Sequence, residues 1–279
     1  MTSAKRKAQS AERSLDVGTT IALVAAGILI LVAILAPWIA PYAPDAIDLA
    51  GRRAPPSPSH WFGTDDLGRD LFARVLFGAR VSLAIGILAA GLTVALGAGV
   101  GVVAGWTGRW IDALLMRIAD AVLSVPRLPL LMIASVILRP GVVTLIVLVA
   151  LVSWMETARV VRAEVRSLAS RGFVEAARAV GASAMTSMWR HIRPNVMPTL
   201  VVATTLAVGR SILLESAMSF FGVGVQPPTA SWGNMLYQAQ ATMATEPWLA
   251  LFPGFAILIS VLTVNALGER LALPRADHA

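Results

Sequence analysis

Residues able to carry out covalent or metal chemistry are scarce in this sequence. It contains no cysteine, and its three histidines lie far apart at His60, His191 and His278. The absence of thiols excludes disulfides and a cysteine nucleophile, and scattered imidazoles argue against a histidine-based metal site. The two lysines, Lys5 and Lys7, follow no glycine-rich turn, so a Walker-type phosphate loop is excluded. We therefore expect no catalytic residue, no cofactor-binding residue and no metal ligand in this chain.

Two other patterns imitate ligand-binding motifs. The aspartates within 65–70 lack the alternating oxygen-ligand spacing of a calcium loop. Residues 99–104 match the dinucleotide fingerprint GxGxxA, but they lie in a long uncharged run with no strand–helix–strand unit around them. Gly97, Gly101 and Gly105 recur every four residues, which instead favours close packing of helices in lipid.

The composition indicates a membrane protein. Of the 279 residues, 57% are hydrophobic and 14% are charged, whereas soluble domains carry about 25% charge. The runs without a charged residue are 17–44, 81–108, 128–138, 140–155, 194–209, 216–245 and 247–268. A spanning helix needs about 20 apolar residues. We place six helices near 20–40, 81–105, 112–138, 142–158, 196–221 and 248–268, which predicts an all-α integral membrane protein with six transmembrane helices.

Two of these spans have unusual features. Pro126 and Pro129 interrupt the third span, which a membrane helix tolerates where neighbours satisfy the freed backbone groups. The first span follows basic residues, as a signal peptide would. Its apolar run is too long for a signal peptide, so we expect it to be retained as a helix.

The basic residues indicate the orientation in the membrane. The N-terminal tail 1–19 carries four of them, the 159–193 loop carries seven, and the 222–247 loop carries none. Because cytoplasmic loops are rich in arginine and lysine, we expect both termini and the loop 159–195 to be cytoplasmic. The remaining divisions are an external segment 41–80, a five-helix core 81–268 and a C-terminal tail 269–279. The net charge of +7 is spread over inner loops, which favours membrane lipids as partners and excludes nucleic acid.

The external segment predicts a helix of its own. Thr64 or Asp65 can cap a helix from Asp66 towards Arg80, whose leucine, valine and phenylalanine residues share one face. Asp70 would pair with a basic residue one turn later, Arg74. We expect this amphipathic helix to lie on the outer bilayer surface.

The large cytoplasmic loop carries the most informative pattern. It begins with Arg159, Arg162 and Arg166 at helical spacing, which we interpret as a basic stripe at the level of the lipid headgroups. A helix-forming segment with several small residues follows, and its marked positions are Glu175, Ala176, Ala177 and Gly181. An Ile-x-Pro sequence, with Ile192 and Pro194, comes after it. Because the alanine and glycine side chains are small, we predict a helix with a low profile that can enter the cleft of a partner closely. The alternative is that this helix folds back onto the membrane spans of the same chain.

This loop resembles the EAA motif of permease subunits in binding-protein-dependent ABC importers. Glu175, Ala176 and Ala177, the glycine four residues later and the Ile-x-Pro sequence carry the likeness. The chain has Arg193 where the family usually has a hydrophobic residue. The segments 60–70, 78–83, 112–126, 215–228 and 232–236 resemble the dipeptide, oligopeptide and nickel permeases, and the last two resemble their C-type subunit.

The resemblance implies a type I ABC importer permease fold in the inner membrane of a prokaryote. It also implies a homologous permease as heterodimer partner, two cytoplasmic ATPase subunits that bind ATP and Mg, and an external solute-binding protein. The loop 175–194 would couple ATP hydrolysis to transport. The cargo would be peptides or similar small solutes, since nickel and opine importers use similar subunits.

Two charges lie within the fifth predicted span, at Arg210 and Glu215. Intramembrane charges are costly and usually face a cavity or a partner. In one interpretation, these two residues line the translocation path or contact another subunit. In the other, they form a structural pair near the outer surface. Both interpretations stay open. We interpret Arg117 and Asp120 in the third span as structural.

Two other classes of function compete with this one. A stand-alone secondary transporter or channel would be expected to show inverted repeats or a string of intramembrane acids. The sequence has no convincing inverted repeat, and only Glu215 lies within a late span. A membrane-embedded enzyme would need clustered nucleophiles, bases or metal ligands, and none is evident.

Overall fold

The computed structural model describes the backbone of residues 2–138 and 141–272, and the side chains from Val17 onward except those of Glu175 and Arg178. These residues form helices and connecting loops, without a β-strand in the described ranges. The elements are α1 (Thr2–Ile39), η1 (Leu49–Gly51), α2 (Leu71–Thr107), α3 (Arg109–Leu123), α4 (Arg127–Leu138), α5 (Val142–Leu151), α6 (Trp154–Ala169), α7 (Gly172–Ala179), α8 (Ala184–Ser187), η2 (Met188–Ile192), α9 (Arg193–Phe220), α10 (Trp232–Ala239) and α11 (Trp248–Ala272).

Four helices are long and apolar enough to cross a bilayer without a break. They are the Val17–Ile39 part of α1, α2, the continuous run from α8 to the end of α9, and α11. Two bent pairs, α3 with α4 and α5 with α6, bring the number of candidate spans to six if each pair counts as one. The prediction of an all-helical chain is confirmed, with four to six candidate spans.

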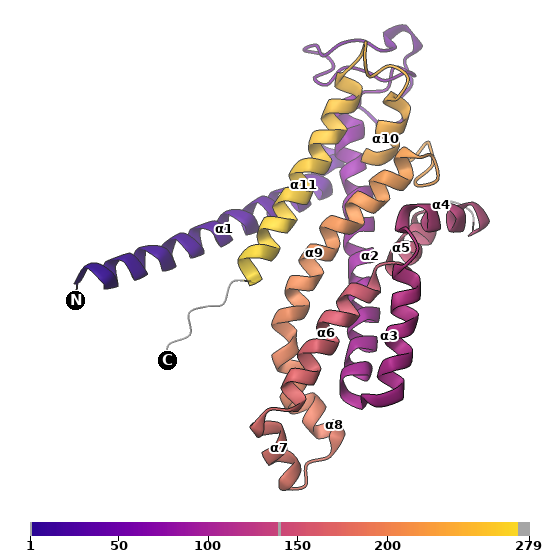
Figure 1. Cartoon of the computed structure of the whole chain (residues 1–279). Helices are drawn as coiled ribbons and strands as arrows, with labels where there is room; N and C mark the ends of the chain where they lie inside the picture. Colours follow the sequence, from indigo (N-terminus) through magenta and orange to yellow (C-terminus); the bar gives the residue numbers. More distant parts are fainter. Residues whose placement is uncertain (1, 139–140, 273–279) are drawn as a thin grey trace.

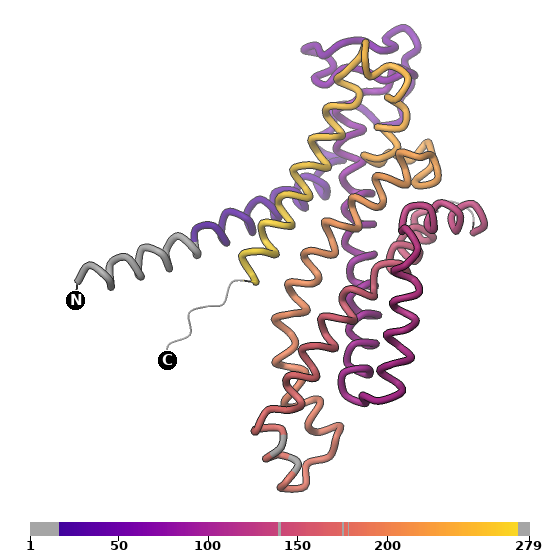
Figure 2. Tube along the Cα trace, viewed as in Figure 1, coloured from indigo at the N-terminus to yellow at the C-terminus, as the bar shows by residue number. Residues whose placement is uncertain are grey.

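The helices form an elongated bundle (Figure 1). The segment 40–70 and α10 lie at one end of it, and α7 and α8 project from the other end. The trace in Figure 2 shows α1 diverging from the bundle towards the N-terminus. Helix α1 begins at Thr2 and its candidate span at Val17, so the backbone of the predicted tail 1–19 is helical, and its cytoplasmic location stays a prediction. Most of the predicted tail 269–279 lies outside the described residues.

Helix α2 lies at the centre of the bundle and packs closely on α6 through glycines. A Cβ atom on Gly97 would lie 2.6 Å from the Trp154 carbonyl oxygen, and one on Gly101 would lie 2.6 Å from that of Ala158. A Cβ on Gly105 would likewise lie 2.9 Å from a carbonyl oxygen of α6. This confirms the prediction that the glycine repeat serves close helix packing.

A second contact region joins α2 to α9, α10 and α11. Leu83, Ile212, Trp232, Ile257 and Val261 form one buried apolar cluster there. The Trp232 indole Nε1 donates to the Val75 carbonyl at 3.0 Å. Burial of large apolar side chains from four helices stabilises the half of the bundle that carries the segment 40–70.

The predicted amphipathic surface helix from Asp66 to Arg80 is wrong. Asp70 is the N-cap, because its Oδ1 accepts from the Ala73 amide at 2.7 Å, and α2 then continues unbroken to Thr107. The preceding residues form loops instead. The helix therefore belongs to the second span and does not lie separately on the bilayer surface.

Buried charges hold the segment 40–70 onto the start of α2. The Arg74 side chain is fully buried, and its Nε lies 3.4 Å from Asp65 Oδ2. Asp65 also pairs with Arg69 at 2.6 Å, while His60 Nδ1 lies 2.8 Å from Asp70 Oδ2. The predicted Asp70–Arg74 side-chain pair is replaced by these contacts. A charge removed from water is stable only with such partners.

The third and fourth predicted spans are not straight helices. The third bends by 87° between α3 and α4, because Pro126 lacks an N–H and disfavours helical geometry at the residue before it. The fourth bends by 42° between α5 and α6, and its helix runs on to Ala169 where we predicted an end near residue 158.

Candidate functional site: a projecting loop and a charged pocket

The loop between α6 and α9 projects from the end of the bundle opposite the segment 40–70 (Figure 1). Ile192 is fully buried and packs with Val161, Val165 and Val196, so apolar contacts fix the end of the loop to both helices. Pro194 lies in the first turn of α9, where its missing N–H costs little. The loop is thus a short helical projection with a rigid base.

The small-residue helix of the loop is α7. Ala176 is exposed and Ala177 half-buried, while the side chain of Glu175 lies outside the described residues. The apolar side chains of Val180 and Met185 are 87% and 66% exposed. An apolar surface beside a small-residue helix is what a docking contact requires.

Gly181 does not lie on the face of this helix. Helix α7 ends at Ala179, and Gly181 follows with a φ of +87°, which closes the helix end in a left-handed conformation. The Ala182 amide then donates to the Ala177 carbonyl at 3.0 Å, as in a glycine-terminated helix. The prediction that Gly181 provides missing bulk on a helix is corrected, because its role is to end the helix.

The arginines that open the loop are paired with acids of α3. Arg162 makes two hydrogen bonds to the Asp112 carboxylate, one of them 2.6 Å long, and Arg166 lies 3.3 Å from the same group. Arg159 pairs with Asp120. These ion pairs fasten α6 to α3, and the prediction of a basic stripe at the level of the lipid headgroups stays a prediction.

Arg210 and Glu215 face different surroundings on α9. The Glu215 carboxylate is fully buried and accepts hydrogen bonds from Ser219 at 2.8 Å and from Ser82 at 3.0 Å. The Trp232 amide donates to the same Ser82 hydroxyl at 3.2 Å. Glu215 thus joins α2, α9 and the start of α10, and it does not pair with Arg210.

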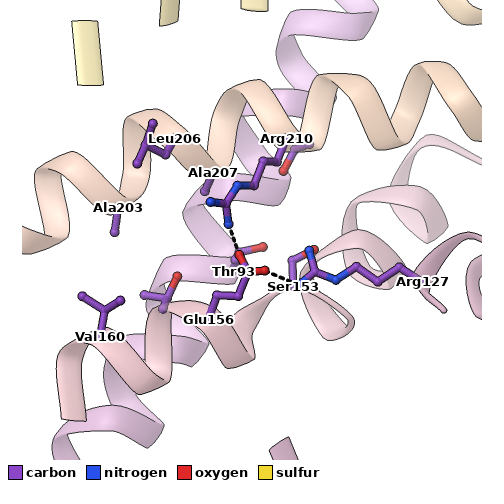
Figure 3. Close-up of a pocket in the computed structure, with 11 residues that line it drawn as sticks. Thr93, Arg127, Ser153, Glu156, Val160, Ala203, Leu206, Ala207 and Arg210 are labelled. Atoms are coloured by element: carbon purple, nitrogen blue, oxygen red, sulfur yellow. Dashed lines mark hydrogen bonds and ion pairs between the residues drawn. The ribbon is translucent and has the colours of Figure 1, made fainter. Parts of the chain in front are cut away.

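Arg210 belongs to a charged pocket between α2, α4, α6 and α9. Its guanidinium pairs with one oxygen of Glu156, and Arg127 Nη2 donates to the other oxygen at 2.6 Å. The pocket has a volume of about 260 Å³, and Thr93, Ser153, Thr157 and Ser211 supply hydroxyls around it. Figure 3 shows Arg210 and Arg127 reaching towards Glu156 from two different helices.

Sequence inspection missed Arg127, Glu156 and Thr93 as members of a site. Glu156 ends one uncharged run and Arg127 precedes another, so both marked only the limits of uncharged runs, although both lie inside predicted spans. The available signal was charge next to a helix break: Arg127 lies one residue after Pro126, and Glu156 lies three residues after the break at Ser153. Such breaks in membrane helices occur where backbone lines a cavity or is buried in protein.

Helices of this length and apolarity define an integral membrane protein, and comparison with known proteins gives its family. Residues 97–273 match the family described as binding-protein-dependent transport system inner membrane component. Residues 19–56 match the N-terminal transmembrane domain of oligopeptide transport permease C. The chain therefore belongs to the family of inner-membrane permeases of binding-protein-dependent transport systems, as the C-type resemblance indicated. The family consists of transport subunits.

Named relatives agree with this family. The chain is 42% identical over 236 residues to a protein of Brucella suis biovar 1 named as a peptide permease, covering 84% of this chain and 78% of the relative. It is 43% identical over 245 residues to the glutathione transport system permease protein GsiD of Escherichia coli O6:K15:H31, covering 88% of this chain and 81% of the relative. The GsiD of Shigella boydii serotype 4 matches equally well.

Proposed function

We propose that this chain is the permease subunit of an ATP-driven importer and forms half of a translocation path for peptides or similar small solutes. It pairs with a homologous permease, docks two cytoplasmic ATPase subunits and receives solute from an external binding protein. We count both bent helix pairs as spans, which gives six spans and both termini on the same side. The arginines and lysines of the N-terminal tail and of the 159–193 loop support the cytoplasm as the side of both termini and of the projecting loop. Family membership and the peptide and glutathione permease relatives support this proposal.

The projecting loop is the coupling element. Its exposed small and apolar residues supply a docking surface, and buried Ile192 ties that surface to α6 and α9. A movement of the docked ATPases is therefore transmitted directly to two helices that line the charged pocket. Such transmission requires only that the nucleotide state favours one of two arrangements of the loop.

Chemical energy comes from the partner subunits. ATP and Mg bind to the ATPases, and this chain contributes no cofactor-binding residue or catalytic group. The chain's sequence has no cysteine and no lysine in a phosphate loop, which agrees with a mechanical role.

The translocation path runs along the face that bears Arg210. The Arg210 side chain is 55% exposed and that of Glu156 is 40% exposed, although both belong to candidate spans. Charges in a spanning region face a water-filled cavity or a partner, which places the path or the sibling permease against this face. Glu215 is assigned a structural role, because its oxygens are satisfied within the chain.

Purification of the tagged chain from its own membranes under native conditions tests the assembly. We expect a second permease and one or two kinds of ATPase to be recovered with it and identified by mass spectrometry. Recovery of the chain alone, stable and folded, would instead support a stand-alone transporter or channel.

A further inference from the structure

We propose that the charged pocket is a recognition site for the carboxylate group of the transported solute, with Arg127 and Arg210 as the cations that bind it. The inference rests on the proposed function, because it names the chemical group that the translocation path recognises. The class of cargo that follows is an anionic or zwitterionic solute, such as a peptide with a free C-terminus.

The pocket lies deep within the spanning helices. With a rise of 1.5 Å per residue, Arg210 is about 15 Å from the nearer end of α9, and Thr93 is about 20 Å from the nearer end of α2. Both helices are candidate spans. A charge held at this depth is costly unless it serves a path or a partner.

The charges of the pocket do not cancel. Two guanidinium groups share the single carboxylate of Glu156, one at each oxygen, so the cluster carries an excess of one positive charge. Each guanidinium has five N–H donors, and the bond to Glu156 uses only part of that capacity. The unused donors suit a second carboxylate, which arginine binds in a bidentate manner.

Two hydroxyls in the pocket have no hydrogen-bond partner among the described residues. Thr93 is only 2% exposed, and its Oγ1 makes no hydrogen bond. The Ser153 Oγ is also buried and makes no hydrogen bond to the described residues. Both residues line the pocket. A buried polar group without a partner is unfavourable, and a polar ligand in the pocket would complete the hydrogen bonds of these two hydroxyls.

The dimensions of the pocket favour one end of a solute. Whole small-molecule ligands occupy pockets of about 300–1,000 Å³, and this pocket measures about 260 Å³. It accommodates a carboxyl-terminal residue while the rest of the solute lies outside, towards the sibling permease. Val160, Ala203 and Leu206 give its inner side an apolar lining, which suits an aliphatic side chain.

The test compares uptake of trialanine and of trialanine amide, which differ only in the C-terminal carboxylate. Uptake is measured in the complete transporter with its unaltered binding protein, so that any change in the ratio of the two rates comes from this chain. We expect Arg210→Gln to reduce uptake of trialanine at least about tenfold relative to the amide, as expected for loss of a charge-assisted hydrogen bond. Arg117→Gln is the matched control, since Arg117 is an exposed arginine of α3 outside the pocket, and it should leave the ratio unchanged.

A second variant guards against loss of assembly. Thr93→Val keeps the shape of a buried side chain whose hydroxyl has no partner among the described residues, so it should leave the amount of assembled complex unchanged and still lower the trialanine-to-amide ratio. An unchanged ratio in both Arg210→Gln and Thr93→Val, with wild-type uptake of trialanine intact, overturns the carboxylate site and leaves the importer function standing. Absence of any peptide uptake by the wild-type complex overturns the peptide assignment, and the carboxylate site falls with it.

Discussion

Glu156 on α6 and Arg210 on α9 pair across the charged pocket, at positions 54 residues apart in the sequence. Arg127 binds the second oxygen of the same carboxylate. This contact links α6 and α9, the two helices that carry the projecting loop, to the break at the start of α4. If the loop moves with the ATPases as we propose, it would alter the same charged groups that we assign to solute recognition.

The Glu156–Arg210 pair should show measurable energetic coupling. We expect Glu156→Gln and Arg210→Gln, alone and combined, to give a double-mutant coupling of about 0.5–1 kcal/mol in thermal unfolding of the purified chain, since both side chains are partly exposed. Additive effects within about 0.3 kcal/mol would show that the contact contributes nothing to stability.

Glu215 should be a stability residue. Replacement by Ala removes the acceptor shared by Ser82 and Ser219, so we expect a loss of about 2–4 kcal/mol, seen as a lower melting temperature. Glu269→Ala, at an exposed position near the end of α11, should change stability by less than about 0.5 kcal/mol. Equal stability of the two variants would contradict the structural role of Glu215.

The packing of α2 on α6 can be tested with two glycines of one helix. Gly101→Ala places a Cβ 2.6 Å from a backbone oxygen of α6, whereas a Cβ at Gly99 meets nothing within 4 Å. We expect Gly101→Ala to destabilise the chain by about 1–3 kcal/mol and Gly99→Ala to be neutral or stabilising by up to about 1 kcal/mol. If Gly101→Ala were neutral in a melting experiment, the close contact would be refuted.

The surface of α7 should be needed for coupling. Ala176→Trp adds bulk at an exposed position and should reduce ATP-driven uptake at least about tenfold, the effect of losing about 1.4 kcal/mol of contact energy. Ala113→Trp, at an exposed position of α3, is the control and should retain uptake. Membrane insertion, measured as the amount of chain in the membrane fraction, should be the same for both variants.

Gaps between charged residues predicted most of the helices, because the bilayer excludes charge over a fixed length. The predicted start of α2 is wrong because Thr64, Asp65 and Asp70 can each act as an N-cap. Only tertiary contacts decide which of the three side chains accepts from the helix amides. Arg74 illustrates the difficulty: its pairing with Asp65 depends on how the segment 40–70 folds over the helix end.

The candidate site was predicted less completely than the fold. The EAA pattern located the loop, yet the positive φ of Gly181 follows from backbone geometry that its neighbours in the sequence do not specify. Arg210 was recognised as a costly intramembrane charge. Its partner Glu156 was not, because pairing between distant helices leaves no periodic signal in one sequence.

Site-directed cross-linking can detect whether α7 docks against a cytoplasmic ATPase. The chain contains no cysteine, so Ala176→Cys introduces a unique thiol that can carry a photoactivated benzophenone in the native complex. We predict an adduct of this chain with an ATPase subunit, identified by mass spectrometry, and none from Ala113→Cys treated in the same way. An ATPase adduct from position 113 but not from position 176 would contradict the account.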